Sequence, residues 1–423
     1  MTAAALPRPG ATARWQWRRL LLAPHRLAFF LAMVVLVAAG LWWALVLFDR
    51  AGAAIGLSHA VSPTTVHSTV MAFGFMPLFF AGFLFTAGPR WLGVRGPAAR
   101  EIATPLLLMS GGWLLWLVAA QVHVGLALAA LLLVQTGLAA VTARFWRLVL
   151  ASDAPDRIHA KAVGCALVAG VCSLGGLAIA LAAGLPGAAR GFVLTGLWSF
   201  VIAIFVIVAH RMIPFFTSSA LPMVDAWRPF WVLGALLGVA LFEASAVWLD
   251  GMLAGSAAWL VLRGLVEMAA AAVVVWLMFA WGLVQSLKVR LLAMLHLGFL
   301  WLGLGLALSG ASTLGAAFTG TPLLPLAGLH AITMGCLGSL MLAMVTRVSC
   351  GHSGRPLVAD NPIWTLFLLL QAATLLRVAA AVPQAPSALL AAAAAGVWAG
   401  VMAAWGIRYG SWYGHARADG RPG

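Results

Sequence analysis

Long apolar blocks alternate with short polar segments along nearly the whole sequence. A helix needs about 20 apolar residues to cross the hydrocarbon core of a bilayer, and it satisfies its backbone polar groups internally. The pattern therefore predicts an all-α polytopic membrane protein with twelve transmembrane helices. These helices are expected to start near Leu27, Thr65, Ala103, Val124, Ala162, Gly191, Phe230, Ala257, Leu292, Leu323, Ile363 and Ser387.

The polar segments between the blocks are too short to form a soluble domain. We therefore expect a basic cytoplasmic tail at residues 1–26, a single twelve-helix transmembrane domain at residues 27–409 and a cytoplasmic tail at residues 410–423. The first apolar block, Leu27 to Phe48, follows basic residues as it would in a signal peptide. It is too long for that role and lacks a small-residue cleavage site, so we interpret it as the first permanent span.

The amino-acid composition also indicates that the protein is surrounded by a lipid bilayer. Hydrophobic residues make up 64% of the chain and charged residues 8%, against about 25% charged residues in soluble domains. The net charge is +15, but the basic residues form short clusters between apolar blocks, as the positive-inside rule expects. Nucleic-acid binding is therefore excluded.

The basic residues also predict the orientation. If both termini are cytoplasmic, 21 of the 25 Lys and Arg residues fall on the cytoplasmic side, and the loss or gain of one helix would scramble this alternation. The pattern thus predicts that both termini lie in the cytoplasm. The remaining four basic residues are Arg50, Arg190, Arg263 and Arg377.

Two histidines occupy matching places in different helices. Ser62 and Pro63 are typical of a helix start and precede His67, and Pro325 can start the tenth helix just before His330. Both rings should lie roughly 6 to 9 Å below the periplasmic helix ends. Each histidine is followed four residues later by a methionine, and this shared HxxxM pattern hints at internal repetition of helical units.

Two imidazoles at equal depth suit a metal centre, and neutral His is a good axial ligand for haem iron. The alternative is that each His hydrogen-bonds a neighbouring helix. Met71 and Met334, one turn further in, are alternative ligands, although Met at such spacing is more often packing. Arg377, near the outer end of the eleventh helix, could pair with haem propionates.

A second group of histidines lies toward the cytoplasm. His210, His296 and His352 could gather into a metal site or a proton-handling site. Within the eighth helix, Arg263 and Glu267 are one turn apart, and we expect a structural ion pair rather than a proton path.

Several segments resemble the NnrS family, bacterial membrane proteins associated with nitric oxide stress and denitrification. The similarity covers almost the whole chain, and its most specific part is the last of the segments Pro24–Leu27, Met71–Trp91, Arg211–Thr217, Leu295–Trp301 and His330–Pro356. The resemblance implies twelve spans, haem and copper. The family usually reads His-x-His-Glu-Met in the second helix, whereas this chain has Thr69 and Val70 in place of the second His and the Glu. If that His is a ligand in typical members, this chain either lacks one metal or belongs to a divergent branch of the family.

A more distant likeness is to the catalytic subunits of haem-copper oxidases and nitric oxide reductases, which have a similar twelve-helix bundle with low-spin haem ligands on helices two and ten. His67 and His330 fit that scheme. This chain has no His in the outer half of the sixth helix and no His pair in the seventh, so the binuclear site is absent.

From these features and the resemblance, we expect a protein that binds haem b through His67 and His330 and that binds or processes nitric oxide or a nitrosyl species. The resemblance further implies copper and a place in the bacterial inner membrane. Two alternatives stay open: a transporter that moves protons or metal ions through its histidines, and a cytochrome b that only carries electrons. The sequence makes no prediction about the catalysed reaction or the oligomeric state.

Overall fold

The computed structural model describes residues 14–421, in which helices dominate and strands are absent. The first half of the chain contains α1 (Pro24–Phe48), α2 (Pro63–Phe73), α3 (Phe75–Leu92), α4 (Ala99–Val122), α5 (Val124–Leu150), α6 (Ile158–Ala182), α7 (Pro186–Gly196) and α8 (Ala203–Ala220). The second half contains α9 (Phe230–Met252), α10 (Ala257–Ala280), α11 (Leu283–Ser286), α12 (Arg290–Thr319), α13 (Ala327–His330), α14 (Ser339–His352), α15 (Asn361–Ala379) and α16 (Ser387–Tyr413).

These helices form twelve stretches that are long and apolar enough to cross a membrane, which confirms the predicted fold class. Four stretches contain more than one element. Helices α2 and α3 form one span, α7 and α8 are joined by the π-helical segment η3 (Leu197–Ile202), and α13 and α14 are joined by the π-helical segment η4 (Ala331–Gly338). A further π-helical segment, η2 (Asp49–Ala53), ends the first span, and a short 3₁₀ helix, η1 (Trp17–Leu22), precedes it.

The break between α2 and α3 occurs at Gly74. Its backbone has φ −77° and ψ −86°, outside the helical region. A Cβ atom at this position would collide with the carbonyl oxygen of Val70, so the close approach requires glycine. Breaks and π-helical segments inside membrane helices are often found at functional sites.

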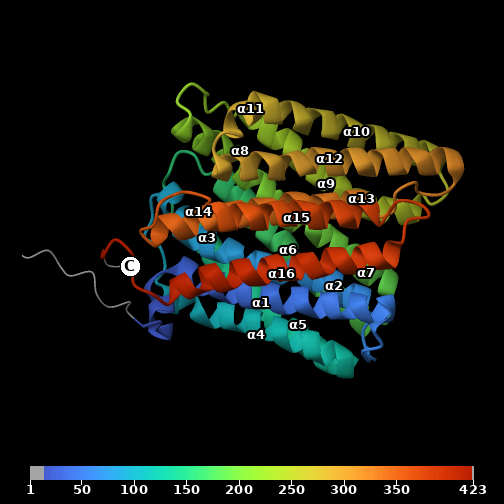
Figure 1. Cartoon of the computed structure of the whole chain (residues 1–423), viewed down its shortest axis with the longest axis horizontal. Coiled ribbons are helices and arrows are strands. Elements are labelled where there is room, and N and C mark those ends of the chain that lie inside the picture. Colours follow the sequence, from blue (N-terminus) through green and yellow to red (C-terminus); the bar gives the residue numbers. More distant parts are fainter. Residues whose placement is uncertain (1–13, 422–423) are drawn as a thin grey trace, which may run out of the picture.

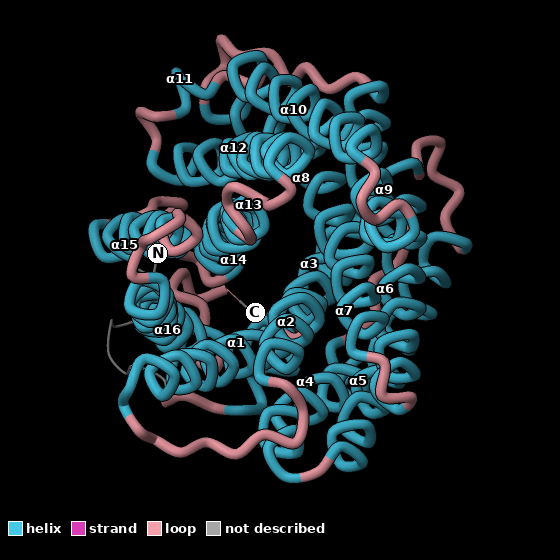
Figure 2. The backbone as a smooth tube through the Cα atoms, turned by 90° about the vertical axis from the view of Figure 1, so that its right-hand side faces the viewer, coloured by secondary structure: helices cyan, strands magenta, loops and turns pink. Residues whose placement is uncertain are grey.

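Seen along the helices, the spans form a closed arrangement in which α2 with α3, and α13 with α14, lie toward the middle (Figure 2). Helix α1 packs against α3 and α16, and α15 packs against α16 and η4. Two helix pairs, α4 with α5 and α10 with α12, lie toward opposite sides of the bundle (Figures 1 and 2). The two inner spans are the ones that carry His67 and His330.

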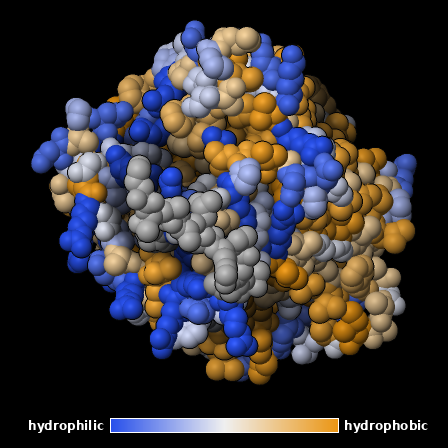
Figure 3. Space-filling view, turned by 60° about the vertical axis from the view of Figure 1, so that its left-hand side comes forward, coloured by the Kyte–Doolittle hydropathy of each residue, from blue (hydrophilic) through white to orange (hydrophobic). Residues whose placement is uncertain are grey.

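Both ends of the described chain lie at the same end of the bundle, which we call the terminal face; the other end is the distal face (Figure 1). Gln16 N–H donates to the carbonyl of Gly414 at 2.9 Å, and Arg26 Nη1 donates to the carbonyls of Tyr413 and His415, each at 3.0 Å. Hydrophilic side chains gather on this face (Figure 3).

The tail after α16 is also held against the terminal face. Arg417 Nη1 donates to the carbonyl of His352 at 3.0 Å, while its Nε donates to Asp419 Oδ1 at 2.9 Å. This hydrogen-bonded pairing lowers the pKa of Asp419 to about 2, so the ion pair stays charged at physiological pH.

The sides of the bundle expose apolar side chains. Leu132, Ile179 and Ile407 are 61%, 73% and 73% exposed, and each lies within a spanning helix. Such side chains would be costly in water but are suited to lipid. The protein is therefore an integral membrane protein.

Candidate functional site

His67 lies four residues inside α2, which begins at Pro63 as predicted. The Ser62 side chain makes no capping hydrogen bond. The imidazole stacks on the indole of Trp43, with ring centres 3.9 Å apart and planes 14° apart. Its Nδ1 atom is buried and has no hydrogen-bond partner among the described residues. The stack on Trp43 therefore sets the plane of the ring.

His330 ends the short helix α13, which starts at Ala327 after Leu326 adopts the left-handed conformation, φ 66°. The ring atom Nδ1 lies 3.0 Å from the carbonyl oxygen of Leu326. A carbonyl can only accept, so Nδ1 carries the proton in the neutral ring and the lone pair is on Nε2. Metal-binding histidines are commonly fixed by this kind of bond to a backbone carbonyl.

Both imidazoles line one cavity of about 270 Å³ near the distal face. Its walls come from α1, α2, α3, α7, η3, η4, α13, α15 and α16, and they are largely apolar. Met71 and Met334 line the same cavity, so both HxxxM pairs converge on one space. This volume approaches the range of about 300–1,000 Å³ that is typical of ligand pockets.

Two arginines also line the cavity. Arg377 is half-buried near the end of α15, and Arg190 lies four residues inside α7. No carboxylate forms a salt bridge with either guanidinium in the part of the chain that the structure describes. Arg377 was predicted from the sequence and Arg190 was not. The position of Arg190 near the start of its helix, opposite the basic loops, indicates the distal side of the membrane but not the cavity.

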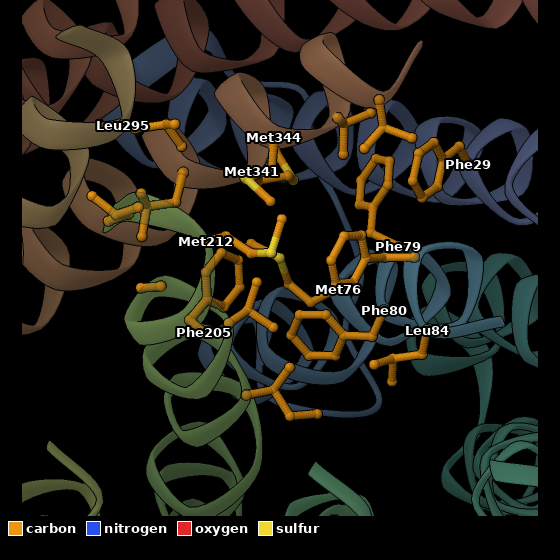
Figure 4. A pocket seen from close by; sticks show the side chains of 18 residues that line it. Phe29, Met76, Phe79, Phe80, Leu84, Phe205, Met212, Leu295, Met341 and Met344 are labelled. Atoms are coloured by element: carbon orange, nitrogen blue, oxygen red, sulfur yellow. The ribbon is translucent and has the colours of Figure 1, made fainter. Parts of the chain in front are cut away.

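A second cavity lies further toward the terminal face and is almost wholly apolar. It has a volume of about 70 Å³ and is bounded by α1, α3, α8, α12 and α14. Figure 4 shows Met76, Met212 and Met341 converging on it from three helices. Met76 lines both cavities, so this single side chain lies between them.

The sequence model of the NnrS protein family matches residues 19–417, nearly the whole chain. The protein belongs to the NnrS family. It is therefore an NnrS-type membrane protein linked to the nitric oxide response. A search of curated proteins found no match to the chain.

The NnrS family pattern departs from this chain at two buried positions. Thr69 and Val70, which replace the usual second His and the Glu, have 0% exposed surface and do not line the large cavity. The Thr69 hydroxyl is buried without a hydrogen-bond partner in the described structure. Position 69 therefore lies on the packed side of α2, away from the face that carries His67.

The structure does not bring His210, His296 and His352 together. His210 pairs with His159, whose Nε2 lies 3.0 Å from His210 Nδ1, and His210 Nε2 contacts the carbonyl of Pro229 at 3.1 Å. His296 Nε2 lies 2.9 Å from the hydroxyl of Thr217.

His352 has a different partner again, since its ring centre is 4.3 Å from that of His25. Within residues 14–421, no three His, Cys, Asp or Glu side chains group as a metal site would require. The pairs His25–His352 and His159–His210 were not predicted from the sequence, because they depend on which helices pack together.

Proposed function

We propose that this protein binds haem b in the large cavity, where His67 and His330 would hold the iron. The observation that carries the proposal is the orientation of His330. Its Nδ1–H donates to the Leu326 carbonyl, so the lone pair of Nε2 is free to bind a metal. His67 lines the same cavity and is held by its stack on Trp43. The apolar walls suit a porphyrin.

The arginines of the cavity support the same cofactor. Arg377, which is half-buried, and Arg190, which is exposed near the start of α7, bring two positive charges to a largely apolar space, and neither has a carboxylate partner in the described residues. Unpaired charge inside a membrane protein is costly. The cost of an unpaired charge therefore falls mainly on Arg377. Haem propionates would offset it, and guanidinium groups bind carboxylates in a fork geometry. The cavity therefore offers two histidines for the iron, apolar walls for the porphyrin and two arginines for the propionates.

The adjoining apolar cavity supports a small uncharged ligand. Its walls carry almost no polar surface, and dry apolar cavities of this kind accept small apolar molecules. A pathway for protons or metal ions needs polar or charged groups instead. This favours nitric oxide or a related uncharged nitrogen oxide as the ligand over transport of ions.

The chemistry would belong to the cofactor, since haem iron supplies nitric oxide binding and electron transfer. The protein residues provide the surroundings. His67 and His330 would hold the haem in place, Trp43 fixes the plane of the His67 imidazole, and the apolar walls exclude water. We further propose that the terminal face is cytoplasmic and that the protein lies in the bacterial inner membrane, because most Lys and Arg residues lie on that side.

The test is to purify the parent protein in detergent, quantify bound haem and record reduced-minus-oxidised spectra beside those of His67→Ala and His330→Ala. We expect the parent to be red with low-spin bands, and each variant to lose most of that signal while it elutes as a folded monodisperse species. His296→Ala is a matched control because it removes a buried membrane histidine outside the cavity. Full low-spin haem in both cavity variants would refute the ligand assignment.

A further inference from the structure

A separate group of charged side chains lies in the membrane between α9 and α10. Arg263 Nε donates to Glu267 Oε1 at 3.1 Å, and its Nη2 donates to Glu243 Oε2 at 3.1 Å. Its Nη1 contacts Asp250. The predicted pair of Arg263 with Glu267 is thus confirmed, but two further carboxyl groups join it. None of these residues lines the cavity of His67 and His330.

The two glutamates lie deep in the membrane. Glu243 is nine residues before the end of α9 and Glu267 ten residues after the start of α10, which places both roughly 15 Å from the distal helix ends. Their side chains are 3% and 0% exposed, whereas Asp250 is 41% exposed. The core of a bilayer is about 30 Å thick, so the glutamates lie near its middle.

The charges of this group do not balance if every carboxyl group is ionised. One guanidinium faces three carboxylates, and no other cation forms a salt bridge with them in the described chain. Asp250 is near the distal end of α9, where water can solvate its charge, and the Trp259 indole donates to it at 2.9 Å. That leaves two buried glutamates for one arginine, and an uncompensated charge in the membrane is costly.

A proton bound between the two glutamates would remove this excess negative charge, and each glutamate has a free oxygen atom for it. Glu243 Oε1 and Glu267 Oε2 are both buried and lack a hydrogen-bond donor in residues 14–421. Glu267 Oε1 and Glu243 Oε2 accept from two nitrogen atoms of the same guanidinium, so the two carboxyl groups lie beside each other. Two carboxylates in contact repel each other, whereas a carboxylic acid and a carboxylate attract through one O–H···O bond.

We propose that Glu243 and Glu267 form a proton-binding site that holds one proton between them at neutral pH. A hydronium ion on the distal side gives its proton to a carboxylate oxygen and leaves as water; the new O–H group donates to the other carboxylate. Asp250 and Arg263 are the charged groups that face the pair, and the exposed Asp250 is the point of exchange with distal water. The site is independent of haem and of the proposed function.

Infrared spectroscopy of the purified full-length protein tests this directly. A protonated carboxyl group has a C=O stretch separate from the carboxylate bands, and the band shifts to lower frequency in D₂O. We expect the parent to show one such band at neutral pH. Glu243→Gln and Glu267→Gln should each abolish it, because one remaining carboxylate is neutralised by Arg263.

Asp250→Asn is the matched control, since it removes a carboxyl group of the same cluster that is solvated. It should keep the band and slow its exchange into D₂O. The absence of the band from the parent would overturn the proposal without any variant. So would a band that persists unchanged in both glutamine variants.

Discussion

At the scale of single residues, the candidate site consists of groups held in position by local contacts. The stack on Trp43 orients His67, and the Leu326 carbonyl orients His330. From the matching depth of these two histidines in two helices, the sequence predicted that they serve one site. It did not reveal Arg190 as a member of the cavity, because the side that a basic residue faces depends on helix packing.

Arg377→Gln tests whether the positive charge of Arg377 acts on the bound haem. A cation beside a haem favours the reduced form, which carries one positive charge less, so its removal should lower the reduction potential. An effect of about 1 kcal/mol corresponds to tens of millivolts for a one-electron couple. Potentiometric titration of the purified protein measures it. Arg95→Gln, which removes a charge from outside the cavity, should leave the potential unchanged, and equal potentials in all three proteins would exclude Arg377 from the haem site.

At the scale of elements, hydropathy predicted all twelve spans, because a run of about 20 apolar residues is the main requirement. It did not predict the break at Gly74 or the π-helical segment η4. Both depend on backbone geometry and on close packing. Hydropathy is averaged over many side chains and is not sensitive to either. These irregular segments flank the cavity, since Thr333 and Met334 of η4 line it.

Gly335 should be essential for the position of η4. A Cβ atom there would lie 2.5 Å from Cγ of Trp301 on α12, so Gly335→Ala must displace one of the two helices. We expect a loss of about 1–3 kcal/mol in the free energy of unfolding and weaker haem retention. Thermal unfolding in detergent measures the stability.

Gly238→Ala is the control for this substitution. A Cβ atom on Gly238 of α9 meets nothing within 4 Å, and alanine favours helix over glycine by up to about 1 kcal/mol. Its stability should equal or exceed that of the parent. If Gly335→Ala unfolds at the same temperature as Gly238→Ala, the close packing of η4 on α12 is not a constraint.

At the scale of the whole molecule, the sequence predicted the number of spans but not which of them lie side by side. His210, His296 and His352 are all near one end of the bundle, yet each contacts a different partner. Glu243 joins the network of Arg263 only because α9 packs beside α10. Such contacts between distant segments depend on side-chain packing, which hydropathy and charge counts do not encode.

Whether His67 and His330 both bind the haem iron is tested most directly by ligand rescue. In His67→Gly and His330→Gly, the missing imidazole leaves room in the cavity, and added free imidazole should restore the low-spin spectrum in each variant. His296→Gly should retain the parent spectrum with no imidazole added. The account is contradicted if neither cavity variant loses the low-spin signal, or if imidazole fails to restore it in folded protein that still holds haem.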